Sequence, residues 1–350
     1  GHSKNIFIIY HFNLFIFPKL NASEILDYET EIFINTIIND IKKINNINRN
    51  IKFKIVSNNN INAFVDQNNV VYLTSGLIEN CNDYVAIISV LAHEIGHIEK
   101  NHIVKRKFEK NKIDNINKLS NLSIIAGSML ASNPEVFKGL SLSTAKLSEL
   151  VINFSKDQER EADYYSIETL KKLNIYSDSI IKLLKKIEKK ALAKGLTKDI
   201  QKISSHPYFE ERIKLINFLN ANKGKNLDSK LNEEFKFIQA KFVGYSKNTE
   251  QLKNLMEPHK SYANSIINAK NGDLKNSFTI LNKLISIDKN NPYLLETKAD
   301  ILYSYGYINE SVKFYEQVVN KLPDNLYAQI RFFENANFKS LTYNEREKIF

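Results

Sequence analysis

The sequence predicts an α+β domain with a small sheet and one long central helix, followed by an all-α repeat domain. Two observations support this fold class. Residues 28–219 alternate between helix-like and strand-like hydrophobic patterns. The last third of the chain instead carries matching residues at a fixed spacing, which is typical of a helical repeat. The length of 350 residues also suits two domains rather than one.

The bulk composition is that of a globular protein. The chain is 43% hydrophobic and 25% charged, with a formal net charge of +10. Its lysines are scattered through nearly every segment and do not form a basic stripe interleaved with aromatic residues. This pattern favours a solvated lysine-rich surface over a nucleic-acid groove, so no nucleic-acid partner is expected. Cys81 is the only cysteine, which excludes an internal disulfide.

Residues 1–22 resemble a processed or exported N-terminus. Residues 1–3 are typical of a residual expression tag, and Lys4 is followed by an apolar run from Ile6 to Phe17 and by the small residue Ala22. This order predicts a secretory signal peptide, and the alternative is an apolar helix of the mature fold. No other segment approaches the ~20 apolar residues that span a bilayer. The mature chain is therefore expected to have no transmembrane span.

The first domain is predicted to begin with a helix and three strands. Apolar residues recur at helical spacing from Tyr28 to Ile44. Apolar residues then alternate with lysines over Ile51–Ile55, and short strands are expected at Ile61–Val65 and Val70–Leu73. A long helix, capped by Asn82 or Asp83, follows and runs to Ile98.

The next elements are predicted to be helices. The segment Leu119–Phe154 is rich in apolar and small residues, and part of it is expected to cover a cleft. Further helices are predicted from about Ser155, over Asp178–Ala193, and within Ser204–Leu219. Residues 221–230 are polar and resemble a linker.

The C-terminal third shows a 34-residue frame. Gly272 and Gly306 have this separation, and Ala299 lies where the first helix of a tetratricopeptide repeat needs a small residue. Leu281 and Tyr315 occupy matching positions in the second helix of each copy. The pattern favours tetratricopeptide repeats over an unrelated helical bundle.

The motif with the clearest chemistry is His93-Glu94-Ile95-Gly96-His97, which has the form HExxH. Positions four residues apart share one face of a helix, so two imidazoles can bind one Zn²⁺. Glu94 then lies beside the metal, where it can take a proton from the attacking water. His102 follows the motif at a spacing that does not suit the same face, which indicates a structural role.

A third ligand is needed for a catalytic zinc, and the helix near Ser155 offers one. Glu159 and Asp163 are one turn apart on the same face, whereas Glu161 lies off that face. Glu159 can bind the metal while Asp163 accepts the N–H of a ligating histidine. Periodicity alone leaves a solvated carboxylate equally open for Glu159.

Taken together, these motifs resemble a known family. His93–His97, Glu159 with Asp163, and His206-Pro207 with Arg212 are similar to the zinc metallopeptidase family of the CAAX prenyl endopeptidase. Its soluble, envelope-located branch also carries C-terminal tetratricopeptide repeats. The stretches Asn62-Ala63-Phe64 and Val71–Leu77 resemble the strand and turn that precede the active helix in that family.

The resemblance implies a zincin-like catalytic domain with one Zn²⁺ per chain. It assigns His93, His97 and Glu159 as ligands, Asp163 as the partner of a ligating histidine, and Glu94 as the catalytic base. It also places His206 near the zinc, where it either stabilises an oxyanion or occupies the open zinc position in a resting enzyme. Arg212 would orient the site or stabilise transition-state charge, with a plain surface salt bridge as the alternative.

The function implied is that of a zinc-dependent endopeptidase of the HExxH…ExxxD type, located in the periplasm or cell envelope. Its clients would be unfolded or misassembled envelope proteins, bound as an added strand at an edge formed by Asn62, Ala63 and Phe64. The alternative is a repeat-based binding or chaperone-like module with latent protease activity, whose repeat domain binds envelope proteins. The expected boundaries are 1–22 for the tag and signal peptide, 23–222 for the peptidase, 223–257 for a linker with connecting helices, and 258–350 for the repeats.

Overall fold

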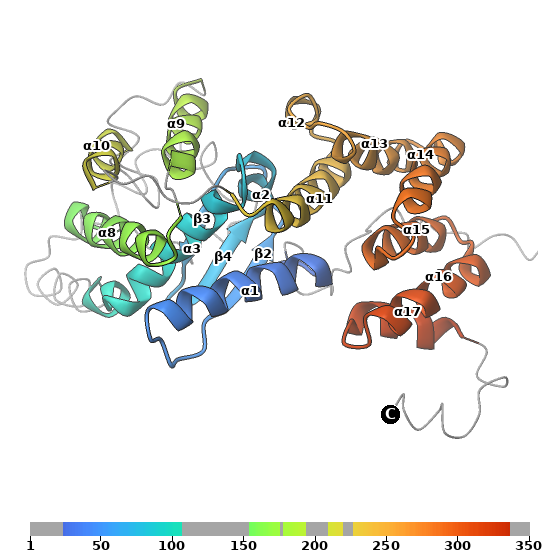
Figure 1. Cartoon of the computed structure of the whole chain (residues 1–350), viewed down its shortest axis with the longest axis horizontal. Helices are drawn as coiled ribbons and strands as arrows, with labels where there is room; N and C mark the ends of the chain where they lie inside the picture. Colours follow the sequence, from blue (N-terminus) through green and yellow to red (C-terminus); the bar gives the residue numbers. More distant parts are fainter. Residues whose placement is uncertain (1–23, 107–153, 176–177, 194–208, 220–226, 337–350) are drawn as a thin grey trace, which may run out of the picture. The chain divides into compact units, whose positions relative to one another are not determined.

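The computed structural model describes residues 24–106, 154–175, 178–193, 209–219 and 227–336. These residues form two compact units (Figure 1). The sheet unit comprises residues 24–25 and the described part of 33–236, and the helical unit comprises residues 26–32 and 237–336. The predicted signal peptide, nearly all of the predicted cover Leu119–Phe154, and His206 lie outside the described residues.

The sheet has four strands in the order β1-β2-β4-β3. They are β1 (Glu24–Ile25), β2 (Lys52–Val56), β3 (Ala63–Val65) and β4 (Val70–Thr74). Strands β2 and β4 are parallel, and the other two pairings are antiparallel. The three predicted strands are confirmed with small shifts of their ends, whereas the two-residue β1 was not expected from the sequence.

A cross-strand aromatic pair is buried on the sheet between β3 and β4. Phe64 of β3 lies opposite Tyr72 of β4, and their rings stack with centroids 4.8 Å apart. Val56 joins the same buried cluster from β2. Aromatic and β-branched residues in directly opposed positions stabilise antiparallel pairs, which explains why such a short strand as β3 is held in place.

A short helix joins the sheet to the central helix. The helix α2 (Ser75–Asn80) begins directly after Thr74, whose side-chain oxygen caps it. The sequence suggested only a turn here. At Gly76, a β-carbon would come within 2.5 Å of the carbonyl oxygens of Asn59 and Asn60. Only glycine allows this close approach between the start of α2 and the loop before β3.

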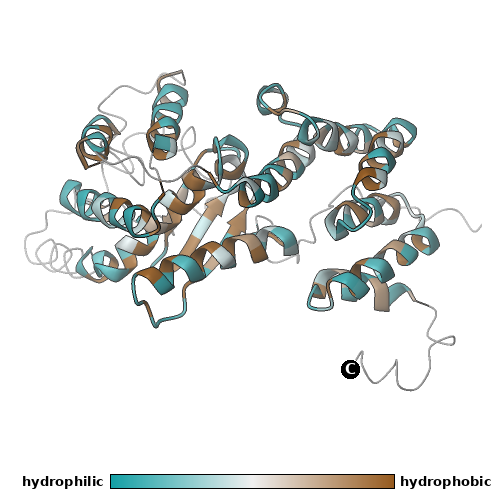
Figure 2. Ribbon diagram, in the orientation of Figure 1, coloured by the Kyte–Doolittle hydropathy of each residue, from teal (hydrophilic) through white to brown (hydrophobic). Residues whose placement is uncertain are grey.

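The central helix α3 (Tyr84–Glu99) is buried along nearly its whole length. Asp83 caps it by accepting hydrogen bonds from two backbone N–H groups, as predicted. The helix is mostly brown in the hydropathy colouring of Figure 2, in contrast to the mixed colours of the surrounding helices. A helix that is apolar around most of its circumference belongs in a core. Here it packs against β3, β4 and the helices α8 (Lys156–Lys172) and α9 (Asp178–Ala193).

Helix α8 begins with a capping box. Ser155 accepts a hydrogen bond from the backbone of Gln158, and the Gln158 side chain accepts one from the backbone of Ser155. This motif satisfies two N–H groups at once and fixes where the helix starts. Helix α10 (Phe209–Leu219) packs against α8 and α9. The sheet unit therefore has α3 at its centre, with helices on one side and strands on the other.

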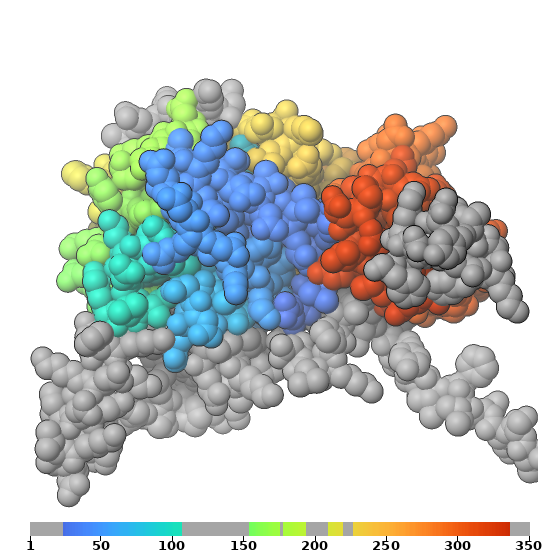
Figure 3. All heavy atoms as spheres, turned by 90° about the horizontal axis from the view of Figure 1, so that it is seen from below, coloured from blue at the N-terminus to red at the C-terminus, as the bar shows by residue number. Residues whose placement is uncertain are grey.

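Helix α1 (Tyr28–Ile44) has the bounds that its periodicity predicted. Its buried face is formed by Phe33, Ile34, Ile37, Ile38 and Ile41. Its opposite face carries the polar residues, and α1 forms part of the blue surface in the space-filling view of Figure 3. The division into an apolar and a polar face is what an amphipathic surface helix requires.

The helical unit consists of consecutive helices joined by short connections. They are α11 (Ser229–Ser246), whose residues up to 236 belong to the sheet unit, α12 (Thr249–Leu252), α13 (His259–Lys270), α14 (Leu274–Ile287), α15 (Pro292–Ser304), α16 (Ile308–Lys321) and α17 (Leu326–Asn335). Residues 229–230 belong to α11, which corrects the prediction of a polar linker extending to residue 230. No helix among the described residues combines the length and apolar composition needed to cross a membrane.

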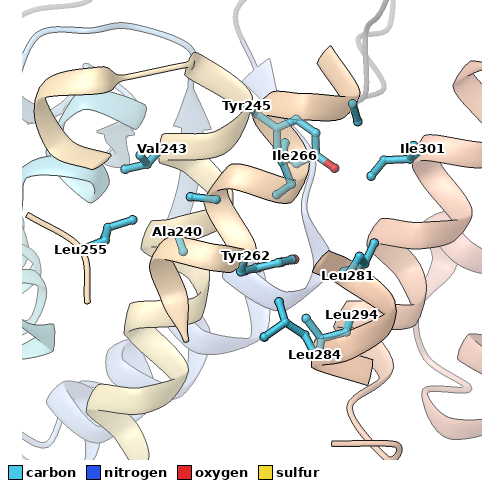
Figure 4. Close-up of a cluster of buried hydrophobic side chains, with 12 residues drawn as sticks. Ala240, Val243, Tyr245, Leu255, Tyr262, Ile266, Leu281, Leu284, Leu294 and Ile301 are labelled. Atoms are coloured by element: carbon cyan, nitrogen blue, oxygen red, sulfur yellow. The ribbon is translucent and has the colours of Figure 1, made fainter. Parts of the chain in front are cut away.

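The 34-residue frame also appears in the positions of these helices. Leu274 and Ile308 begin α14 and α16, and Pro292 and Leu326 begin α15 and α17, each pair 34 residues apart. Gly272 and Gly306 follow α13 and α15 with φ of +86° and +83°, a backbone conformation that favours glycine. The predicted inward positions Ala299, Leu281 and Tyr315 are all buried. Figure 4 shows the main cluster, to which α13 contributes Tyr262, α14 contributes Leu281 and α15 contributes Ile301.

Candidate metal centre

Two buried helices bring three potential ligands together in the sheet unit. His93 and His97 lie one turn apart on α3, and Glu159 lies in the first turn of α8. Their ligand atoms lie within 4.8 Å of one another, and all three side chains are buried. Within the part of the chain that the structure describes, this is the one group of three such ligands that converges.

The distances between these atoms fit a tetrahedral metal ion. The Nε2 atoms of His93 and His97 are 3.1 Å apart. The Glu159 oxygens lie 3.3 Å from Nε2 of His93 and 3.5 Å from Nε2 of His97. Ligands at ~2.1 Å from a tetrahedral zinc are ~3.4 Å from each other. The three residues can therefore hold one metal ion and leave a fourth position open.

The orientation of His93 also indicates a cation. Its Nδ1 lies 2.9 Å from Oδ1 of Asp163. We assign the proton to Nδ1, because an ionised carboxylate can only accept. The lone pair of Nε2 then faces Nε2 of His97 and the carboxylate of Glu159. In a buried site these electron pairs repel one another unless a metal ion or a further proton lies between them, and a metal ion would satisfy all three groups at once.

Arg212 is part of this buried network, which corrects the alternative of a surface salt bridge. Its side chain is only 7% exposed, and it donates two hydrogen bonds to Asp163, at 2.8 Å from Nε and 2.7 Å from Nη2. Its Nη1 lies 3.6 Å from Glu159. Burial disfavours the charged form of Asp163, but Arg212 and His93 outweigh it and lower the pKa of Asp163 to about 2.

His97 is held between an aromatic ring and a second imidazole. Phe154, the last residue of the predicted cover segment, stacks on His97 with ring centroids 3.7 Å apart. Burial lowers the pKa of His97 to about 4, although Glu159 acts in the opposite direction. A neutral imidazole is the form that binds a metal. The environment of His97 thus already favours the ligating state at neutral pH.

His102 and Glu161 also belong to the centre, although helical spacing predicted no role for them there. Nδ1 of His102 lies 2.9 Å from Nδ1 of His97, and its Nε2 lies 2.9 Å from Oε2 of Glu161. The helical spacing that excluded His102 does not apply, because the chain turns at Asn101, where φ is +55°. Asparagine tolerates this conformation better than most residues, so Asn101 was the one available signal.

Glu94 follows His93 directly on α3 and is 1% exposed. Its negative charge acts on both His97 and Arg212, which places it beside the ligand group. A carboxylate next to the metal ligands, but not among them, can accept and return a proton. The helix therefore presents two ligands and one acid–base group within five residues.

The predicted substrate strand is placed at the end of the sheet. Asn62 precedes β3, and Ala63 and Phe64 belong to it. Strand β3 is terminal in the strand order and packs against α3, the helix of His93 and His97. Its side chains are buried, so recognition there would depend on main-chain atoms. The remaining predicted site residue, His206, is not among the described residues.

A sequence profile of peptidase family M48 matches residues 33–219, which is more than half of the chain. The match spans the HExxH helix, Glu159, Asp163 and Arg212. The chain belongs to peptidase family M48. This confirms the recognition made from the motifs, and an α+β zincin-like catalytic domain fits both the family and the sheet unit.

Individual proteins are similar to this chain over the following stretches. The beta-barrel assembly-enhancing protease of Yersinia pestis is 25% identical over 66% of this chain and 47% of its own length. The protein of the same name from Escherichia coli (strain K12) is 24% identical over 61% of this chain and 43% of its own length. Metalloprotease YcaL of the same strain is 30% identical over 48% of this chain and 62% of its own length. The chain thus spans less than two thirds of each of these relatives.

Proposed function

We propose that this M48 chain is a zinc-dependent endopeptidase that cleaves unfolded or misassembled envelope proteins. The observation that carries the proposal is the convergence of His93, His97 and Glu159 on one buried point, with Glu94 beside it. Three protein ligands with a fourth position open are the arrangement of catalytic rather than structural zinc. The relatives named as proteases support the reaction class.

The metal would supply a Lewis acid that polarises the scissile carbonyl and makes water more acidic. Glu94 would accept a proton from the attacking water and then deliver it to the leaving amine. Asp163 would hold His93 in its ligating orientation, with Arg212 fixing Asp163 in turn. His206 would stabilise the developing oxyanion or, in a resting enzyme, occupy the position intended for substrate.

Peptide recognition is proposed to use the edge of the sheet. In the antiparallel pair, Thr74 donates to the carbonyl of Asn62, and Asp66 donates to that of Val70. Backbone groups of alternate residues point in opposite directions, so those of Phe64 point toward β4 and those of Ala63 point away. Proline at position 63 would remove the N–H of Ala63, which is not one of the groups that join β3 to β4. A folded Ala63→Pro protein that cleaves peptides at the wild-type rate would rule out this mode of binding.

A second candidate function is protein binding by the helical unit. The 34-residue spacing of its helix starts supports tetratricopeptide repeats, which commonly bind protein segments. On this view the repeats bind envelope proteins or client segments, and proteolysis is latent. The proposed location in the periplasm or cell envelope rests on the sequence resemblance and on the predicted signal peptide. The proposed domain boundaries at 222 and 257 rest on the change in composition after residue 220 and on the repeat frame.

The deciding experiment compares wild type and Glu94→Gln for cleavage of casein, together with the zinc content of each protein. We expect one zinc per chain in both and a loss of cleavage in Glu94→Gln of at least ~100-fold, because a general base typically contributes that much. Equal cleavage by the two proteins would contradict the assignment of Glu94. Bound zinc without cleavage by either would favour the binding function.

His206→Ala separates the two roles proposed for that residue. Faster casein cleavage than wild type would identify His206 as inhibitory in the resting enzyme. Slower cleavage with unchanged zinc content would identify it as a catalytic group.

A further inference from the structure

The two ligating histidines contact different groups through their Nδ1 atoms. The Nδ1 of His93 contacts Asp163 at 2.9 Å, whereas the Nδ1 of His97 contacts another imidazole, that of His102, at 2.9 Å. His102 in turn contacts Glu161 at 2.9 Å through its Nε2. Both ligating histidines are therefore connected to a carboxylate, one directly and one through a second histidine.

The proton positions in the hydrogen-bonded series His97–His102–Glu161 follow from the charge of Glu161. An ionised Glu161 can only accept, so His102 must donate from Nε2. A neutral His102 with its proton on Nε2 has a lone pair on Nδ1 and must accept there. His97 must then donate from Nδ1, which leaves the lone pair of its Nε2 directed at Glu159 and His93. This is the tautomer that a metal ligand needs.

We propose that His102 and Glu161 are positioning residues that set the tautomer of His97 for metal binding, through a histidine–histidine–carboxylate relay. The inference rests on the metal centre proposed above and extends it to two residues outside the ligand set. Partners behind a ligating histidine typically change metal affinity by ~10- to 100-fold, because they fix both ring orientation and basicity.

The packing of α8 explains how the relay is held. The first two turns of this helix supply the ligand Glu159, the relay carboxylate Glu161 and the His93 partner Asp163. Gln158 from the same segment contacts the carbonyl of His102 at 3.5 Å. Docking α8 on α3 therefore assembles the ligand and the groups behind both histidines in one step.

Glu161 allows a clean test, because its side chain is 50% exposed whereas His102 is fully buried. Glu161→Lys replaces an acceptor by a donor. A donor at this position would favour a proton on Nδ1 of His102, and thus the wrong tautomer of His97. Glu161→Gln offers either an acceptor or a donor and should have an intermediate effect.

Matched controls are available on the same helix. Glu168 is also partly exposed and pairs with Lys171 rather than with the centre. Glu168→Gln and Glu168→Lys make the same changes of charge without touching the relay. Thermal melting of the metal-free proteins would verify that all four variants fold like wild type.

The experiment measures the dissociation constant of Zn²⁺ for the full chain by competition with a chromophoric chelator. We expect wild-type affinity for both Glu168 variants, a several-fold loss for Glu161→Gln, and a loss of ~10-fold or more for Glu161→Lys. Nitrogen-15 NMR of histidine-labelled, zinc-loaded wild type should show a proton on Nδ1 of His97 and on Nε2 of His102.

Two results would overturn the relay alone: equal zinc affinity of Glu161→Lys and Glu168→Lys, or a proton on Nδ1 of His102 in the zinc-loaded protein. A wild-type chain that binds no zinc would instead overturn the proposed metal centre, and the relay with it. The two failures are thus distinguishable without any measurement of peptide cleavage.

Discussion

At the scale of single residues, the centre depends on how buried charges are compensated. Asp163 and Glu159 would be costly to bury as isolated carboxylates. Arg212 lies against both, with two hydrogen bonds to Asp163. The planar guanidinium fits a carboxylate through two parallel bonds, which lysine cannot reproduce. Arg212 therefore keeps Asp163 ionised and fixed behind His93.

Replacing Arg212 by methionine should strongly destabilise the protein. Removing one partner of a buried ion pair leaves the other uncompensated, at a cost of ~3–5 kcal/mol in the free energy of unfolding. Urea denaturation of the metal-free protein measures this loss. Arg160→Met is the matched control, because Arg160 is 62% exposed and lies 3.9 Å from Asp157, and we expect a change below ~0.5 kcal/mol. Similar midpoints for the two variants would show that Arg212 does not carry this role.

At the scale of elements, the crossing of α3 and α8 decides whether the ligands meet. Gly96 lies inside the HExxH motif at this crossing. A β-carbon there would lie 3.1 Å from Cβ of Tyr165 and 3.3 Å from Cα of Ala162, closer than ordinary packing contacts. The glycine lets the backbone of α8 come near enough for Glu159 to reach the two histidines. The motif thus determines the packing distance as well as the ligands.

Gly96→Ala is therefore expected to weaken zinc binding several-fold. The added methyl would push α8 outward by a few tenths of an ångström and carry Glu159 with it, and metal sites tolerate little displacement of a ligand. The zinc dissociation constant measures this effect. Gly244→Ala is the control, since its β-carbon would lie 2.8 Å from Cβ of Ile266 in the helical unit. That variant should lose ~1–3 kcal/mol by overpacking but keep wild-type zinc affinity. Unchanged zinc affinity in Gly96→Ala would show that α8 can adjust without moving Glu159.

At the scale of the whole molecule, both units contain buried charged groups, but these groups have different surroundings. In the sheet unit, the buried charged residues Glu94, Asp163 and Arg212 lie at the ligand group. In the helical unit, Lys241 is buried with Asp27 at 2.8 Å and Glu29 at 2.6 Å. Two more carboxylates, Glu296 and Asp300, lie close to this cluster and are partly buried. The helical unit therefore holds more negative than positive groups at this point.

This excess predicts that lower pH stabilises the helical unit. Burial, followed by repulsion from Asp300, raises the pKa of Glu296 above its usual 4.5, and burial likewise raises that of Asp300 above 3.8. The folded state then binds more protons than the unfolded chain above these usual values. Its stability should accordingly fall as the pH rises, until the raised pKa values are passed. The melting temperature, measured between about pH 5 and 8, should therefore fall as the pH rises.

Asp300→Asn tests the origin of the slope. The amide oxygen can still accept the hydrogen bond that Tyr315 donates to Asp300, but the group no longer titrates. We expect a flatter dependence of melting temperature on pH and higher stability at pH ~8. Asp288→Asn, at an exposed position, should leave the slope as in wild type. A slope unaffected by Asp300→Asn would assign the pH dependence to other groups.

Much of this protein was determined by local patterns that are visible in the sequence. The periodicity over Tyr28–Ile44 and Asp178–Ala193 predicted both helices with the bounds that the structure shows. The HExxH spacing placed His93 and His97 on one face, because that geometry belongs to any α-helix. The separation of Gly272 and Gly306 likewise indicated the 34-residue frame in which α14 to α17 begin.

Other features were decided only when distant segments packed together. The pairing of Glu24 with Val56 adds β1 to the sheet, yet two residues carry no periodic signal. Periodicity left Glu159 undecided between ligand and surface carboxylate, and it assigned Glu161 and His102 to no site at all. Their roles depend on the docking of α8 on α3 and on the turn at Asn101. The physical reason is that helical spacing fixes neighbours within an element, whereas the partner that faces a side chain from another element is set by tertiary packing.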